Sequence, residues 1–177
     1  TGLLARPLWG TLSVELGVIE TKKTDPGTNK GFRPVVSYAN GPLTVRAGVE
    51  AIRWGDGAEF QKATGFGATG SYNLGGITLL GNYAHLKVDD GGVDLKQDTF
   101  GLVANADMGL TGGVILSNTK VPGAEKFKIT TLYAAYAIPF FDIKGATILP
   151  AFSYSKAGGS NRNPDEKGLR LRFFYTF

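Results

Sequence analysis

The sequence predicts an all-β fold, an antiparallel transmembrane β-barrel of about ten strands with short turns at one side and longer loops at the other. Three observations predict it. Polar and apolar residues alternate with a period of two over long segments. The connections between these segments alternate between long polar stretches and tight turns. Aromatic residues collect near the segment ends, where an amphipathic ring suits a lipid–water interface.

The alternation is clearest in the last segment, GLRLRFFYTF, where Leu169, Leu171 and Phe173 share one face and Arg170 and Arg172 the other. Three earlier segments, 7–20, 42–54 and 97–107, alternate in the same way. Segments 77–87, 126–139 and 143–156 have two mixed faces, so their register stays open, and a mixed face would suit contact with another subunit. Taken in order, we expect strands at about 7–20, 32–39, 42–54, 66–74, 77–87, 97–107, 110–118, 126–139, 143–156 and 168–177.

The connections divide into two kinds. The long ones are TKKTDPGTNKG, GDGAEFQKATG, VDDGGVDLK, NTKVPGAEK and KAGGSNRNPDEK, and the tight ones are ANGP, LGG, DMGL and PFFD. They alternate strictly along the chain, as the loops and turns on the two sides of a membrane barrel do. Asn40-Gly41 and Gly75-Gly76 supply the positive φ angles that tight hairpins require.

Composition bounds the chemistry. The 177 residues, 26 of them glycine, predict one domain over 1–177. With no cysteine and one histidine, the sequence offers no disulfide, thiolate metal site or histidine-rich metal site, and we expect no cofactor. A net charge of +4 without a basic run does not indicate nucleic-acid binding. The longest apolar run, LYAAYAIPFF, is shorter than the roughly 20 residues of a membrane-spanning helix, and the N-terminus has no signal-peptide layout.

The C-terminal residues carry a family resemblance. Phe177, with Tyr175, Phe173 and Leu171 at alternate positions, resembles the C-terminal β-signal of Gram-negative outer-membrane proteins, which the barrel-assembly machinery reads. The stretches FRPVVSYANGPLTVRAGVE and GATGSYNLGGITLLGNYAHLKVDDGGVDLKQDTFGLVANADMG resemble hairpins of general diffusion porins. The resemblance implies an outer-membrane location, contact with lipid and lipopolysaccharide, passive diffusion of small polar solutes, and a homo-oligomer such as a trimer.

The sequence departs from the porin pattern in two respects. General porins have 16 strands and an inward loop whose acidic residues face arginines, and this sequence has neither that strand number nor that loop. No constriction residue of the family can therefore be transferred to a position here. The chain is either a small barrel, whose even strand number permits closure, or the C-terminal part of a larger barrel.

The inward-facing charges are the candidate pore lining. The predicted register assigns to it Glu15, Arg46, Glu50, Asp107, Lys128, Arg170 and Arg172. Cations outnumber carboxylates in this set, so a wet lumen would weakly prefer anions. The alternative is a plugged interior in which the charges pair and nothing is conducted. Small residues at inward positions such as Gly48, Gly67, Ala84 and Gly101 favour an open lumen.

Other functions remain as alternatives. A closed structural or adhesion barrel would bind a partner or lipopolysaccharide through loop cations such as Lys22, Lys23 and Arg162. A membrane enzyme would need His85 as a general base, but NYAHLKVDD offers no nearby serine, so we expect no enzyme. The loop VDDGGVD lacks the pattern of a calcium site, so we expect no bound metal. A soluble β-sandwich would have to bury the face formed by Leu169, Leu171, Phe173, Tyr175 and Phe177.

Overall fold

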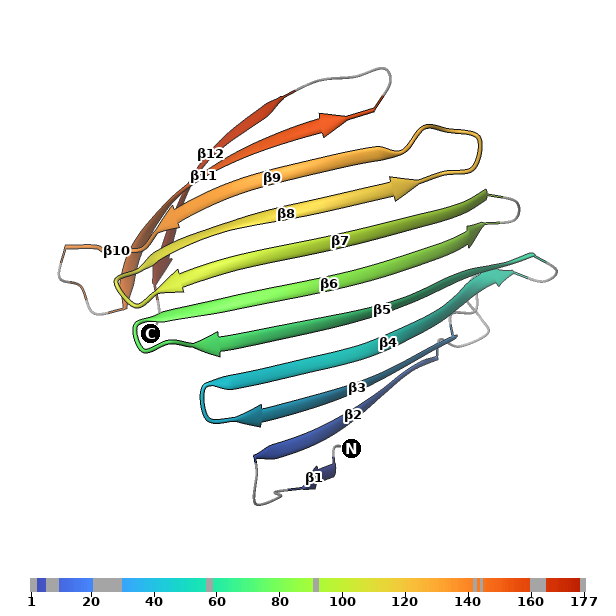
Figure 1. Cartoon of the computed structure of the whole chain (residues 1–177), viewed down its shortest axis with the longest axis horizontal. Helices are drawn as coiled ribbons and strands as arrows, with labels where there is room; N and C mark the ends of the chain where they lie inside the picture. The colour runs from blue at the N-terminus through green and yellow to red at the C-terminus, as the bar shows by residue number, and fades with distance from the viewer. Residues whose placement is uncertain are drawn as a thin grey trace.

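The computed structural model describes residues 3–5, 10–20, 30–56, 59–90, 93–141, 143, 145–159 and 165–175. Within them the chain forms ten long strands and two short ones, and all of them belong to one sheet (Figure 1). The short strands are β1 (Leu3–Ala5) and β10 (Ile138–Pro139). The long strands are β2 (Thr11–Glu20), β3 (Lys30–Asn40), β4 (Leu43–Asp56), β5 (Glu59–Asn73), β6 (Ile77–Asp90), β7 (Val93–Ala106), β8 (Leu110–Lys120), β9 (Phe127–Tyr136), β11 (Ala146–Gly158) and β12 (Glu166–Tyr175).

The sheet is an antiparallel meander. From β1 to β9 each strand pairs with its neighbours in sequence, β9 then pairs with β11, and β11 pairs with β12. The prediction of an all-β antiparallel fold is therefore confirmed. Among the described residues no ladder joins β12 to the first strands, so the sheet is open (Figure 1). The closure expected of a ten-strand barrel is not seen in this part of the chain.

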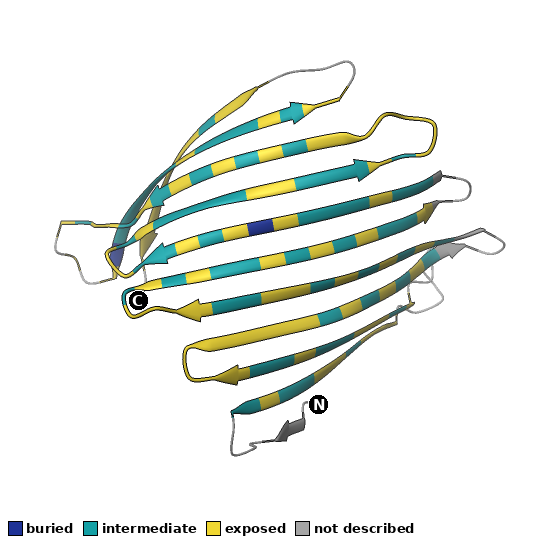
Figure 2. Cartoon of the chain, viewed as in Figure 1, coloured by how far each residue is buried: buried dark blue, intermediate teal, exposed yellow. Residues whose placement is uncertain are grey.

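The sheet is a single layer without a core. Of the described hydrophobic residues only Ala146 is buried, at 9% exposure. Exposed and half-buried positions alternate along β6 and β9, and no second layer covers either side (Figure 2). A soluble sandwich would bury one face against another sheet, and this sheet does not. No helix in the described residues is long and apolar enough to cross a membrane.

Each predicted segment corresponds to one of the ten long strands, with one interruption. The segment predicted at 126–139 divides into β9 and β10 at Ala137, whose N–H donates to the carbonyl oxygen of Gly109 at 2.9 Å. The register of β9 against β11 nevertheless continues through β10, since Ala135 pairs with Ala151 and Ile138 pairs with Ile148. β9 and β10 are therefore one strand, interrupted only at Ala137, where the backbone N–H bonds the turn residue Gly109.

The predicted lengths of two connections are wrong. The β4–β5 ladder continues to the pair Asp56–Glu59, and the β6–β7 ladder continues to Asp90–Val93. Only residues 57–58 and 91–92 connect these strands, so GDGAEFQKATG and VDDGGVDLK are mostly strand. An antiparallel ladder pairs backbone groups whatever the polarity of the side chains, so polar residues can extend it. The strict alternation of long and short connections is therefore not present.

The two ends of the sheet still differ. We call the end that carries connections 21–29, 121–126 and 159–165 the long-connection end, and the other the short-turn end. Two of the short turns have the predicted geometry, because Gly41, Gly75 and Gly76 have φ angles of 52°, 76° and 100°. These angles lie in the region that glycine adopts at little cost, as the Asn-Gly and Gly-Gly pairs predicted.

Candidate pore-lining face

The strand registers divide the sheet into two faces. The apolar face carries Leu171 and, through the ladders, Phe152, Leu132, Leu102 and Val45. Most of the exposed large hydrophobic side chains lie on it, from Leu12 and Val18 on β2 to Phe173 on β12. The polar face is the opposite one. Its members include Ser13, Ser37, Arg46, Thr69, Asn82, Gly101, Ile115, Thr131, Ser153 and Arg170.

Five of the seven predicted lining residues share the polar face. Glu15, Arg46 and Glu50 lie on β2 and β4, and Arg170 and Arg172 lie on β12, at the far side of the sheet. The structure therefore divides them into two groups rather than one ring. The ladders show that these residues share a face, but they do not show whether that face lines a channel.

The other two predicted residues lie elsewhere. Lys128 pairs with Asn118 and Gly158 on the apolar face, so its predicted inward position is corrected. Both faces of β9 carry mixed residues, so periodicity could not set its register. Asp107 lies in the turn after β7, and its N–H donates to the carbonyl oxygen of Gly76 at 2.9 Å. It belongs to the short-turn end and not to a strand face.

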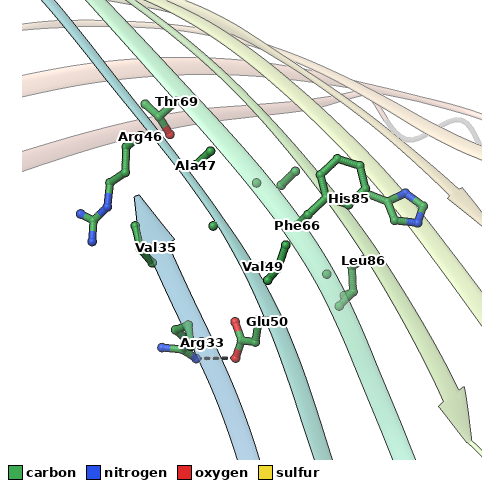
Figure 3. Close-up of a pocket in the computed structure, with 14 residues that line it drawn as sticks. Arg33, Val35, Arg46, Ala47, Val49, Glu50, Phe66, Thr69, His85 and Leu86 are labelled. Carbon is green, nitrogen blue, oxygen red and sulfur yellow. Dashed lines mark hydrogen bonds and ion pairs between the residues drawn. The ribbon is translucent and has the colours of Figure 1, made fainter. Parts of the chain in front are cut away.

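Two ion pairs neutralise the carboxylates of the first group. Arg46 Nη2 lies 3.1 Å from Glu15 Oε2, which links β4 to β2 across β3. Arg33, on β3, bonds the carboxylate of Glu50 directly opposite it on β4 (Figure 3). All four side chains are at least one-third exposed, so the pairs contribute little to stability. Their main effect is to fix where charge lies on the polar face.

Arg33 is a lining candidate that the sequence prediction missed. The segment KGFRPVVSY does not alternate cleanly around Pro34. Arg33 nevertheless lies two residues before Val35, so the two side chains share a face of the strand. The sequence predicted its partner Glu50 as a lining residue, and the structure shows that Arg33 is the cation paired with it.

A hollow lies over the polar face beside these pairs. It has a volume of about 430 Å³ and spans β3 to β6, with Arg33, Arg46 and Glu50 among its lining residues (Figure 3). Glycines form its floor, since Gly48 pairs with Gly67 and Gly65 stands opposite Glu50. A Cβ at Gly65 would meet the carbonyl oxygen of His85 at 2.8 Å. Because these glycines have no side chains, nothing projects from this part of the face to fill the hollow.

The rest of the polar face carries hydroxyl groups and two unpaired arginines. Thr131 and Ser155 share a hydrogen bond of 2.9 Å, and Gln97 donates to Ser117 at 3.0 Å. No described carboxylate lies within ion-pair distance of Arg170 or Arg172. With Glu15 and Glu50 neutralised, the described charges of the polar face that remain are Arg170, Arg172 and Glu166, all on β12, and they leave an excess of one positive charge.

His85 lies on the apolar face and has a partner that the sequence prediction did not identify. Its Nδ1 lies 2.7 Å from Asp98 Oδ1, and Tyr83 donates its hydroxyl hydrogen to the same oxygen at 2.7 Å. The His85 ring also packs against Phe66 at a centroid distance of 5.4 Å. The described contacts bring no serine hydroxyl to His85, and no group of three metal-ligating residues occurs within the described ranges.

Some predictions lie outside the described residues. The loop cations Lys22, Lys23 and Arg162 belong to segments that the structure does not describe, and so does Phe177 of the C-terminal signal. The described part of that signal alternates as predicted, with Leu171, Phe173 and Tyr175 on the apolar face.

Comparison with solved structures identifies proteins of the same fold. The chain is similar to an anion-selective porin from Comamonas acidovorans, with a TM-score of 0.74 and 18% identity over 99% of this chain and 58% of that one. It is similar to the trimer form of OmpT, an outer-membrane protein of Vibrio cholerae, with a TM-score of 0.68 and 15% identity over 98% of this chain and 61% of that one. No protein-family model and no curated protein matches the sequence.

These likenesses establish the fold. The chain has the sheet of an outer-membrane β-barrel protein, a fold of the Gram-negative outer membrane. It spans about three-fifths of the length of the solved chains that it matches. At this identity the residues of the neighbours cannot be transferred to positions here.

Proposed function

We propose that the chain forms the wall of an outer-membrane channel for small polar solutes, with a weak preference for anions. The single observation that carries this is the charge on the polar face. The carboxylates of Glu15 and Glu50 are held by arginines, whereas Arg170 and Arg172 have no carboxylate partner among the described residues. A wet passage with such an excess of cations lowers the energy of an anion within it.

The apolar face supports the membrane location. Exposed side chains such as Leu16, Phe66, Leu132 and Leu171, between 48% and 57% exposed, form a broad apolar surface over the strands. A water-soluble protein rarely exposes a patch of this extent. In a bilayer the same surface contacts lipid, and the polar face then encloses water.

We infer that further strands complete the barrel. Open sheet edges do not occur in the hydrocarbon region of a membrane, because each unpaired backbone group costs several kcal/mol. The described sheet has two open edges, and the solved chains that it matches are longer. Of the two alternatives from the sequence, a small barrel or part of a larger one, we therefore propose that the chain is part of a larger barrel. A trimer, the form recorded for one of the matched proteins, is the assembly we propose for it.

Planar-bilayer conductance of the full polypeptide tests the proposal. We expect stable steps and a reversal potential in a salt gradient that reports anion preference. In the Arg170→Glu/Arg172→Glu variant the preference should move toward cations, because the face loses two positive charges and gains two negative ones. The control, Lys126→Glu/Lys156→Glu, makes the same charge change at the long-connection end. A folded protein that never conducts would contradict the channel and favour the structural barrel.

We also propose that the protein has no catalytic activity. His85 bonds Asp98 and packs on Phe66, and the described contacts bring it no nucleophile. A His85→Ala variant should therefore conduct as the parent does. An activity on lipid or peptide substrates that this variant loses would contradict the proposal.

A further inference from the structure

One row of residues on the polar face changes its chemistry from strand to strand. The register places Arg33 on β3 beside Glu50 on β4, and it then aligns Glu50 with Gly65 on β5 and Leu86 on β6. The row therefore passes from an ion pair, across a position without a side chain, to an apolar side chain. These four residues line the hollow of about 430 Å³ on the polar face (Figure 3).

The middle of this hollow is apolar. Gly48 pairs with Gly67 in the next row, and Gly65 lies two residues before Gly67 on the same face of β5. Val35 leans over one edge, because a Cβ at Gly48 would lie 3.0 Å from its Cγ2. Leu86 borders the other edge, because a Cβ at Gly65 would lie 3.8 Å from its Cδ1. The glycines and these two side chains therefore enclose a compact apolar space within the polar face.

The charged end of the hollow offers a donor beside an acceptor. Arg33 and Glu50 bond each other, yet their side chains are still 50% and 37% exposed. A guanidinium group has five N–H donors and a carboxylate has two oxygens, so the bond between them leaves each able to bind a solute. Arg46, which also lines the hollow, is paired with Glu15. These four charges cancel, so the hollow does not favour a solute with a net charge of either sign.

We propose that the hollow is a subsite for an α-amino acid with an aliphatic side chain. The carboxylate of the solute would accept a hydrogen bond from Arg33, and its ammonium group would donate one to Glu50. The two charged groups are neighbours in the solute as they are in the wall, and such charge-assisted bonds are the strong ones. The volume of the hollow lies in the range of small-molecule sites. The inference rests on the proposed channel and names one class among its polar solutes.

The aliphatic side chain of the solute decides between this class and simpler solutes. It would lie over the glycines, between Val35 and Leu86. Glycine as a solute carries both charges but has no group to place there. A carboxylate with an aliphatic tail, such as 4-methylpentanoate, fills the apolar space but brings a negative charge to Glu50 without an ammonium group. Each of the two should therefore bind more weakly than L-leucine.

Saturation-transfer NMR of the full polypeptide in detergent tests the site without requiring conduction. The probe is L-leucine, with glycine and 4-methylpentanoate as comparisons, and L-leucine should bind severalfold more tightly than either. In Glu50→Gln the affinity for L-leucine should fall on the order of tenfold, as the loss of one charge-assisted hydrogen bond predicts. The affinity for 4-methylpentanoate should rise in the same variant, because Arg33 no longer has a competing carboxylate. Parallel changes for the two solutes, or no change, would overturn the proposal.

Two matched pairs of variants separate the hollow from the rest of the sheet. Leu86→Asn should weaken L-leucine severalfold and leave glycine unchanged. Its control is Ile115→Asn, since Ile115 lies on the same face outside the hollow and is 38% exposed against 37% for Leu86. Gly67→Ala adds a methyl group within the hollow and should weaken L-leucine, whereas Gly70→Ala, on the opposite face of β5, should not. Equal effects within either pair would overturn the proposal.

Conductance separates this site from the channel itself. L-Leucine bound in the hollow should lower the single-channel current at concentrations near its dissociation constant. A current that does not change while NMR shows binding would overturn the assignment of the hollow to the conducting path. A protein that conducts but binds no L-leucine contradicts this site alone, whereas one that binds L-leucine without conducting contradicts the channel alone.

Discussion

Single side chains decide the charge of the polar face. Arg46 is held by Glu15, and Arg33 is held by Glu50, so each carboxylate cancels one cation on the face that we propose lines the channel. Arg170 and Arg172 have no such partner in the described part of the chain. The selectivity we propose therefore depends on which carboxylates are present as much as on the number of arginines.

Removing one of these carboxylates gives a prediction. In Glu15→Gln the cation of Arg46 is no longer cancelled, so the ratio of anion to cation permeability should rise roughly twofold, the scale of one charge acting through water. The reversal potential in a salt gradient measures it. Glu125→Gln removes the same charge from the connection 121–126 and should leave the ratio unchanged. A fall in anion preference with Glu15→Gln would contradict the assignment of this face to the lumen.

Close packing on the polar face gives a second prediction. A Cβ at Gly113 would meet the Tyr133 ring and the carbonyl oxygen of Leu102, both at 2.8 Å. Gly113→Ala should therefore lower the free energy of unfolding by about 1–3 kcal/mol, measured by urea titration in detergent. Gly112→Ala is the control, since its nearest atom would be 3.7 Å away. Equal stability of the two variants would mean that Tyr133 does not lie over Gly113.

The sequence alone predicted the face of some of these side chains but not of all. Where one face is apolar over most of the strand, as in β2, β4 and β12, alternation assigned Glu15, Arg46, Glu50, Arg170 and Arg172 to one face, and the ladders agree. Lys128 was misplaced because both faces of β9 are mixed, and only pairing with β8 and β11 sets its register. The bond between His85 and Asp98 joins residues 13 apart on neighbouring strands, which no local pattern indicates.

Strands and turns were the most predictable elements. The period-two pattern located all ten long strands, because alternation sets which residues share a face wherever one face is apolar. The ends of β4 to β7 were not predictable from polarity. Polar residues such as Gln61 and Lys62 continue the ladder as well as apolar ones do, since the backbone makes the hydrogen bonds.

The turn between β5 and β6 gives a third prediction. Gly76 has a φ of 100°, which an L-amino acid with a side chain adopts only with strain. Gly76→Ala should lower the free energy of unfolding by about 1–2 kcal/mol. Gly81→Ala, at a position with open space and no positive φ, serves as the control in the same denaturant titration. If Gly76→Ala costs no more than the control, the turn does not require that geometry.

The whole molecule is a single curved layer whose two faces need different surroundings (Figure 1). Its apolar face has no partner within the described chain, and its polar face carries hydroxyl groups, arginines and a glycine-floored hollow. The fold class was predictable from alternation. Closure was not, because the pairing of the first and last strands depends on contacts that no local pattern specifies.

Accessibility of single cysteines along β4 in lipid vesicles tests the central claim most directly, namely that one face meets water and the other lipid. The chain has no cysteine, so each introduced thiol is the only one. Cysteines replacing Thr44, Arg46 and Glu50 should react quickly with a charged thiol reagent. Those replacing Val45, Ala47 and Val49 should be protected by lipid. Equal reactivity of both series, or the reverse pattern, would contradict the account.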